Sequence, residues 1–174
     1  MKWRCECQQI LDQSNVTIIQ GGNRKYNISQ IINLLNADSD IQDPFYCQQL
    51  QKIKKEYENW LINLQEFENQ LSGQVTPNFI QLIKLITKNQ YQDNNLQTKL
   101  WQYYIQMIWI QKAEEFVEAK ANPQAYKTLI SCATYANIDS KNILLLKLKE
   151  HLFIMDDLSR KLKEYQEQRF LEQA

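Results

Sequence analysis

Apolar residues recur three and four positions apart through most of the chain, which is the spacing of one face of an α-helix. The clearest run lies between residues 50 and 71. Seven apolar residues form this seam: Leu50, Ile53, Tyr57, Trp60, Leu64, Phe67 and Leu71. The opposite face carries polar residues: Lys54, Lys55, Glu58, Asn59 and Asn63. We therefore expect one long helix with a solvated face, ended by Ser72-Gly73.

The same order of short helix, polar break and long helix occurs three times. The periodicity predicts short helices at 28–35, 79–86 and 126–133, and long helices at 50–71, 96–119 and 143–170. These units recur about every 45 to 50 residues, a period typical of helical arrays, although residue identity between them is low. Short connections favour antiparallel neighbours. The expected fold is all-α, an antiparallel helical bundle array of about three short-helix/long-helix units.

Proline positions indicate where helices begin. Each of the three prolines follows a good N-cap residue: Asp43-Pro44, Thr76-Pro77 and Asn122-Pro123. Proline is well suited to the first helical position, where its missing N–H costs nothing. A fourth helix start is expected at Asp139 or Ser140, just before an apolar run.

Residues 1–25 differ from the rest of the chain. Residues 16–20 form the one β-like run, which Gly21-Gly22 closes. We expect two parts: an extended arm with a Cys5-x-Cys7 pair at 1–25, and a helical repeat-like bundle at 26–174.

Charge and composition exclude several classes of partner. Twenty basic and twenty acidic residues cancel, so no overall field draws in phosphates, and we expect no nucleic-acid partner. The longest apolar runs are far shorter than the ~20 residues of a spanning helix, so we expect no membrane contact. Four cysteines without a disulfide framework and a polar start favour the nucleus or the cytoplasm.

No residue pattern indicates catalysis. The single histidine, His151, lies beside an apolar seam, where a boundary position fits better than a general base. The acidic pairs Asp156-Asp157 and Glu114-Glu115 point about 100° apart on a helix and do not share a proton easily. No glycine-rich phosphate loop occurs. We therefore expect no catalytic and no cofactor-binding residues, and an enzyme of this kind would need catalytic groups from another subunit.

Three further features leave alternatives open. The last long helix carries basic residues beside Tyr165 that suit a nucleic-acid or acidic-partner contact, or an ordinary polar face: Lys147, Lys149, Arg160, Lys161 and Lys163. Trp101, Tyr104 and Trp109 suit core packing better than a methyl-lysine cage. Cys5 and Cys7 have the spacing of half a zinc site, but the other ligands would have to come from Cys47 or from another chain. We assign no metal ligand.

The order of these features resembles the region that follows the zinc finger of JARID-type (jumonji/ARID) histone lysine demethylases. Four pieces carry the resemblance: Arg4-Cys5-Glu6-Cys7, the extended 16–20, Tyr26-Asn27-Ile28-Ser29-Gln30-Ile31, and Glu56-Tyr57-Glu58-Asn59-Trp60-Leu61. Residues 79–119 and 126–167 resemble the next helical units. The resemblance implies a helical platform that offers surface to chromatin partners, with Cys5 and Cys7 as the end of a zinc finger.

That family's iron-binding and 2-oxoglutarate-binding residues have no counterpart here, so demethylase activity is not implied. We expect a non-catalytic helical scaffold that binds a protein partner, associated with chromatin in the nucleus. The alternative is a cytoplasmic spectrin-like or coiled-coil tether or adaptor, which would use the same seams to oligomerise.

Overall fold

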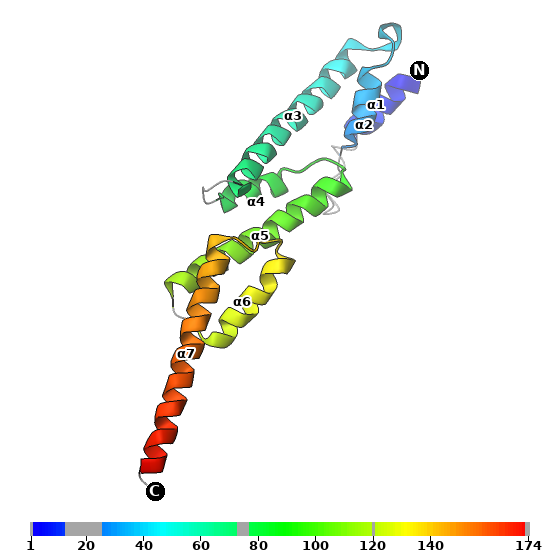
Figure 1. The fold of residues 1–174 in the computed structure, drawn as a ribbon. Helices are drawn as coiled ribbons and strands as arrows, with labels where there is room; N and C mark the ends of the chain where they lie inside the picture. The colour runs from blue at the N-terminus through cyan, green and yellow to red at the C-terminus, as the bar shows by residue number, and fades with distance from the viewer. Residues whose placement is uncertain (1, 13–25, 73–76, 120, 173–174) are drawn as a thin grey trace. The chain divides into compact units, whose positions relative to one another are not determined.

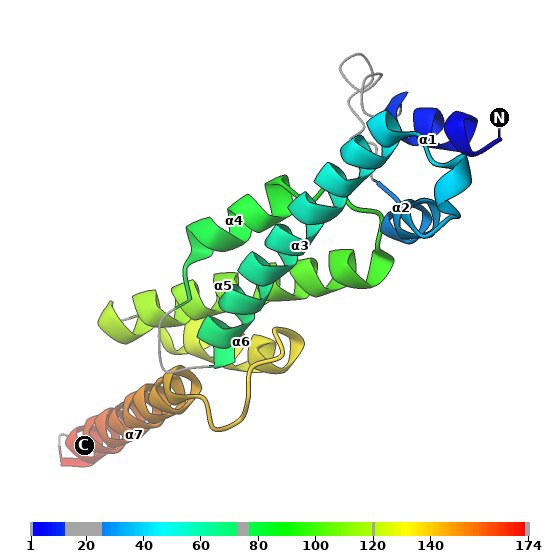
Figure 2. The same ribbon diagram turned by 90° about the horizontal axis from the view of Figure 1, so that it is seen from above.

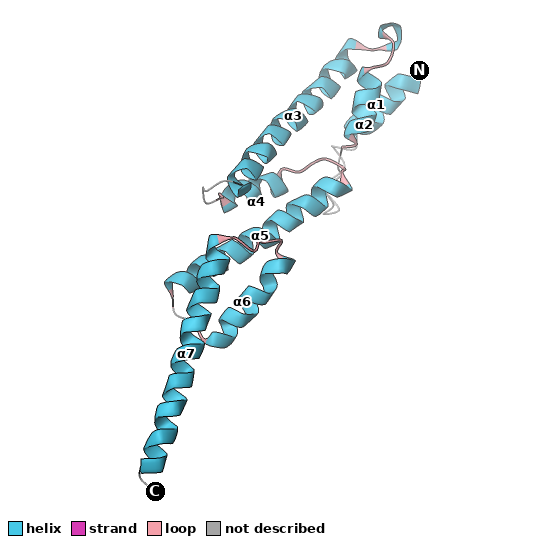
Figure 3. Ribbon diagram, viewed as in Figure 1, coloured by secondary structure: helices cyan, strands magenta, loops and turns pink. Residues whose placement is uncertain are grey.

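The computed structural model describes residues 2–12, 26–72, 77–119 and 121–172 (Figure 1). Within these ranges the chain is helical and has no strand, which confirms the all-α class (Figure 3). One isolated parallel bridge joins Tyr26 to Tyr91. The chain divides into two compact units between Leu100 and Trp101, and each is described separately below.

The N-terminal unit is built around one long helix. Its elements are α1 (Lys2–Asp12), α2 (Ile28–Leu35), a 3-10 turn (Ser39–Ile41), α3 (Pro44–Ser72), α4 (Phe79–Thr87) and the first turns of α5 (Asn94–Glu118). Helices α1, α2 and α4 all pack against α3. The core at the end of α3 that meets α1 and α2 contains Trp3, Cys7, Ile10, Ile31, Leu34, Leu50 and Ile53.

The C-terminal unit consists of the remainder of α5, α6 (Pro123–Tyr135) and α7 (Ile143–Glu172). Helix α6 packs against the first half of α7 and runs in the opposite direction (Figure 1). Tyr126 of α6 is almost fully buried, and its hydroxyl donates to the carbonyl of Phe116 in α5 at 2.6 Å.

The expected extended arm is wrong for its first part, because residues 2–12 form α1. Trp3, Cys7 and Ile10 are spaced four and three apart and are all buried, so this segment has the apolar face of a core helix. The β-like run at 16–20 lies outside the described residues.

Two of the four expected helix starts are confirmed. Helices α3 and α6 begin at Pro44 and Pro123, and the side chains of Asp43 and Asn122 accept backbone N–H bonds there. The start expected at Thr76-Pro77 is wrong, since α4 begins at Phe79 behind Asn78. Likewise α7 begins at Ile143 behind Asn142, and not at the expected Asp139 or Ser140. In both cases a carboxamide nearer to the apolar run caps the free amides.

One type of hydrogen bond, from a tryptophan indole to a leucine carbonyl, recurs three times in the described residues. The hydrophobic pattern of the sequence did not predict this repeat. Three tryptophan indoles each donate to the carbonyl of a leucine in the next helix. The three pairs are Trp3 to Leu34 at 3.0 Å, Trp60 to Leu85 at 3.1 Å, and Trp109 to Leu129 at 2.9 Å. A buried indole N–H needs such an acceptor, so each bond fixes the register of a short helix on the preceding one.

The short helices share residue identities as well as this bond. Each follows an asparagine cap whose side chain accepts a backbone N–H: Asn27, Asn78 and Asn122. The fourth residue after each cap is fully or almost fully buried, and the seventh is the leucine that accepts the indole N–H. The residue identity between the units is low overall, but the asparagine caps and the leucines that accept the indole N–H are shared.

Replacing Asn78 by alanine is expected to lower the free energy of unfolding by about 1 kcal/mol. Its Oδ1 accepts from the backbone N–H groups of Ile80 and Gln81, and alanine leaves both donors to water alone. Urea denaturation followed by circular dichroism measures the change. Asn78→Asp is the control, because aspartate caps equally well, and a loss as large as that of alanine would contradict the capping role.

Candidate functional site

The residues that the sequence singled out do not come together into one site. Among the described residues, no group of three or more His, Cys, Asp or Glu side chains is placed to hold a metal ion. Cys5 is exposed and Cys7 is buried, on opposite sides of α1. Two residues along a helix correspond to about 200° of rotation, so the two thiols do not converge.

The thiol of Cys7 belongs to the core around Trp3 and Leu50. Burial raises its pKa to about 11, and the neighbouring Cys47 and Glu6 add to the shift. The thiol is therefore protonated at neutral pH, whereas a zinc ligand is a thiolate.

At pH 8 iodoacetamide is expected to alkylate the exposed Cys5 and Cys132 in the native protein and to leave Cys7 unmodified. Unfolding in urea should make all four cysteines react, which mass spectrometry measures. Because the pKa of Cys7 is higher in the folded state, its contribution to stability is complete below the unfolded pKa of ~9 and is lost as the pH rises through about 11. Labelling of Cys7 as fast as Cys5 would contradict this burial.

The other candidates have local structural partners. His151 meets the ring of Tyr126 edge-on at 6.1 Å. Asp157 contacts Lys161 and Arg160 at 2.8 and 2.6 Å, and these hydrogen bonds lower the pKa of its carboxyl group. Two of the basic residues of α7 thus lie in a mixed polar face.

The aromatic residues of α5 do not form a cage. Trp109 is buried with its indole N–H bonded to Leu129. The expected core packing is wrong for Trp101, which is exposed and meets Tyr104 edge-on at 5.7 Å. Glu115 pairs with Lys112 at 2.6 Å, at the surface.

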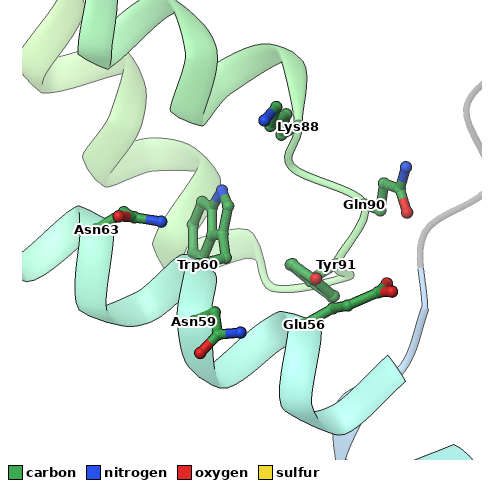
Figure 4. A pocket seen from close by; sticks show the side chains of 7 residues that line it. All are labelled: Glu56, Asn59, Trp60, Asn63, Lys88, Gln90 and Tyr91. Atoms are coloured by element: carbon green, nitrogen blue, oxygen red, sulfur yellow. The ribbon is translucent and has the colours of Figure 1, made fainter. Parts of the chain in front are cut away.

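A groove lies where α3 meets α4 and the link that follows α4 (Figure 4). Its larger part has a volume of about 410 Å³, and a neighbouring part of about 170 Å³ shares Trp60, Asn63 and Lys88 with it. The larger part is lined by Glu56, Asn59, Trp60, Asn63, Lys88, Gln90 and Tyr91. We call the two parts together the α3/α4 groove.

Two buried aromatic residues form the floor of the α3/α4 groove. The rings of Trp60 and Tyr91 meet edge-on at 5.7 Å, and Tyr57 contacts both. Burial raises the pKa of Tyr91 to about 12, with Glu56, Tyr26 and Tyr57 adding to the shift, so the phenol is neutral at pH 7.

Backbone interactions hold Tyr91 in place. The buried side chain of Asn89 accepts from the N–H of Tyr91 at 3.1 Å. Tyr26 donates to the carbonyl of Gln90 at 2.6 Å and accepts from the N–H of Gln92 at 2.8 Å. The link is therefore tied on both sides, although it has no regular secondary structure.

Five exposed polar side chains surround this floor: Glu56, Asn59, Asn63, Lys88 and Gln90. Within the described ranges, none of these side chains forms a hydrogen bond or an ion pair. Figure 4 shows that Asn59 and Asn63 come from α3, and Lys88 and Gln90 from the opposite wall. The rim of the groove thus presents three carboxamides and two opposite charges, which can form hydrogen bonds and ion pairs with a bound ligand.

Sequence reasoning missed this site. It placed Asn59 and Asn63 on the solvated face of a long helix and Trp60 in its seam, and both placements are right. Lys88 and Gln90 lie in a polar break without periodicity, so nothing in the pattern predicted that they would face α3.

No described helix is both long and apolar enough to span a bilayer. No protein-family model, curated protein or solved structure matches this chain.

Proposed function

We propose that this protein is a non-catalytic helical scaffold that binds an extended segment of a partner protein in the α3/α4 groove. The observation that carries the proposal is the ring of exposed polar side chains around the aromatic floor, which form no hydrogen bond or ion pair with any described residue. Carboxamides both donate and accept hydrogen bonds, as the backbone of an extended peptide does. An aromatic floor adds apolar contact area at low entropic cost.

The composition of the groove supports binding over catalysis. Among the described residues that line it, there is no histidine, cysteine or serine. Glu56 and Lys88 form no hydrogen bond with a nucleophile in the described residues, and the raised pKa of Tyr91 keeps the phenol protonated. A general acid or base needs a pKa near the working pH and a partner within hydrogen-bond reach.

The sequence resemblance to the helical region of histone lysine demethylases favours a chromatin-associated partner and a nuclear location. An immunoblot of nuclear and cytoplasmic fractions tests this part. A nuclear band supports the chromatin partner, and a band confined to the cytoplasm contradicts it. Sedimentation at micromolar concentrations tests the alternative, since a coiled-coil tether would self-associate and the proposed scaffold should be a monomer.

Affinity capture with matched variants tests the groove. The double variant Asn59→Ala/Asn63→Ala removes two carboxamides without touching the core, since both side chains are exposed. We expect it to bind the captured partner at least about tenfold more weakly, the equivalent of two lost hydrogen bonds. Gln65→Ala is the control, because Gln65 is exposed and lies about 200° round the same helix from Asn63. Equal capture by all three proteins would refute the proposal.

A further inference from the structure

The last long helix repeats the core pattern of α3. Leu148, Leu158, Leu162 and Tyr165 of α7 have the same spacing as Leu50, Trp60, Leu64 and Phe67 of α3, with a constant difference of 98 residues. Helix α5 has the last three positions too, as Trp109, Ala113 and Phe116. These three positions hold a large apolar residue, an aliphatic residue four positions later and an aromatic residue three positions after that.

Burial differs sharply between the copies. Trp60, Leu64 and Phe67 of α3 are 5%, 3% and 0% exposed. Their counterparts in α7, Leu158, Leu162 and Tyr165, are 60%, 58% and 60% exposed. Leu50 of α3 and Leu148 of α7, which lie ten residues before Trp60 and Leu158, are both fully buried.

In α3 and in α5 a short helix covers this part of the long helix. Helix α4 packs on α3 and accepts the indole N–H of Trp60. Helix α6 packs on α5 in the same way: its Leu129 accepts the indole N–H of Trp109, and the ring of its Tyr126 lies 5.5 Å from the ring of Phe116. No described helix of the C-terminal unit takes this place on α7.

The uncovered residues of α7 continue an interface that already exists. Helix α6 covers the first half of α7, where Leu145 and Leu148 are buried and Lys127 reaches Asp156 at 3.7 Å. The second half of α7, drawn in orange and red, extends past α6 (Figures 1 and 2). The apolar stripe therefore runs from a covered into an uncovered stretch of one helix.

We propose that Leu158, Leu162 and Tyr165 form a docking surface for a short amphipathic helix of a partner protein, bound as α4 is bound on α3. The stripe spans eight residues, about 12 Å at 1.5 Å per residue, which matches the nine-residue α4. A coiled coil between two copies of α7 needs a seam of three to four heptads. This surface lies in the C-terminal unit and does not depend on the α3/α4 groove.

The repeat also defines the chemistry of the partner helix. In α4 the cap Asn78 is followed by apolar residues at the fourth, seventh and eighth positions: Leu82, Leu85 and Ile86. The docked helix should carry a polar cap and apolar residues at the same three positions, which is a helix-in-groove mode of recognition.

A peptide of residues 77–89, labelled with fluorescein, is the probe. A hydrocarbon staple joins positions 80 and 84, which are exposed in α4, so that the peptide is helical before binding. We expect the full-length chain to bind it, as measured by fluorescence anisotropy. The variant Leu158→Asp/Leu162→Asp should bind at least about thirtyfold more weakly.

Two further variants complete the test. Phe153→Asp should bind like the wild type, because Phe153 is exposed and lies about 140° round the helix from Leu158. Leu158→Trp should bind about threefold more tightly or better, because its indole supplies the donor that Trp60 provides in α3.

Three results would overturn the proposal. The first is that the full-length chain does not bind the peptide. The second is equal binding by the wild type and the double aspartate variant, which would place the peptide elsewhere. The third is a dimer in sedimentation that the double aspartate variant abolishes, which would make a second copy the occupant of this surface.

Discussion

Replacing Trp60 by alanine is expected to lower the free energy of unfolding by about 3 to 5 kcal/mol. The side chain is 5% exposed, its ring packs against Tyr57 and Tyr91, and its indole N–H bonds to Leu85. Alanine leaves a cavity under the α3/α4 groove and an unpaired carbonyl in α4. Urea denaturation followed by circular dichroism measures the loss.

Two controls separate the parts of this effect. Trp60→Phe keeps an aromatic ring and removes the donor, so it should cost about 1 to 3 kcal/mol. Trp101→Ala should change stability by less than about 0.5 kcal/mol, because Trp101 is exposed. If Trp60→Ala is as mild as Trp101→Ala, the indole bond does not anchor α4.

Replacing Trp109 by alanine is expected to destabilise the C-terminal unit by a similar amount, about 3 to 5 kcal/mol. Trp109 is 3% exposed and holds α6 through the carbonyl of Leu129. Hydrogen exchange of the α6 amides, read by mass spectrometry, should become much faster, since α6 loses its anchor on α5.

Trp101→Ala again serves as the matched control, because it lies in the same helix and is exposed. Unchanged exchange in α6 of the Trp109→Ala variant would show that contacts with α7 alone hold α6. Faster exchange throughout α1 and α2 in that variant would show that the repeat bonds do not act within their own units.

Periodicity predicted the long helices well, because a seam such as that from Leu50 to Leu71 is a local property of the sequence. Helix α3 (Pro44–Ser72) extends the predicted 50–71 by six residues at its N-terminus and one at its C-terminus, and α7 extends 143–170 by two residues. Helix boundaries with competing caps were harder. The observed caps are Asn78 and Asn142 in place of the predicted Thr76 and Asp139. Each asparagine lies nearer than the predicted cap to the first buried residue of its helix.

Helix α1 was not predicted, because the Cys5-x-Cys7 spacing also fits half a zinc site in an extended arm, although Trp3, Cys7 and Ile10 have helical spacing. The α3/α4 groove could not be predicted, since it depends on how Lys88 and Gln90 meet Asn59 and Asn63 in space. The repeated tryptophan hydrogen bond was not predicted either, because the number of residues between donor and acceptor changes from one unit to the next: 31, 25 and 20. The resemblance to demethylases stays a prediction.

Site-specific photo-crosslinking in the α3/α4 groove tests the central claim most directly. The photoreactive residue p-benzoylphenylalanine is placed at Asn63 in one sample and at Gln65, on the other side of α3, in another. Each labelled protein is irradiated in extracts of cells that express the natural protein. The account predicts a defined protein adduct from position 63 and none from position 65. The same adducts from both positions, or no adduct from position 63, would contradict it.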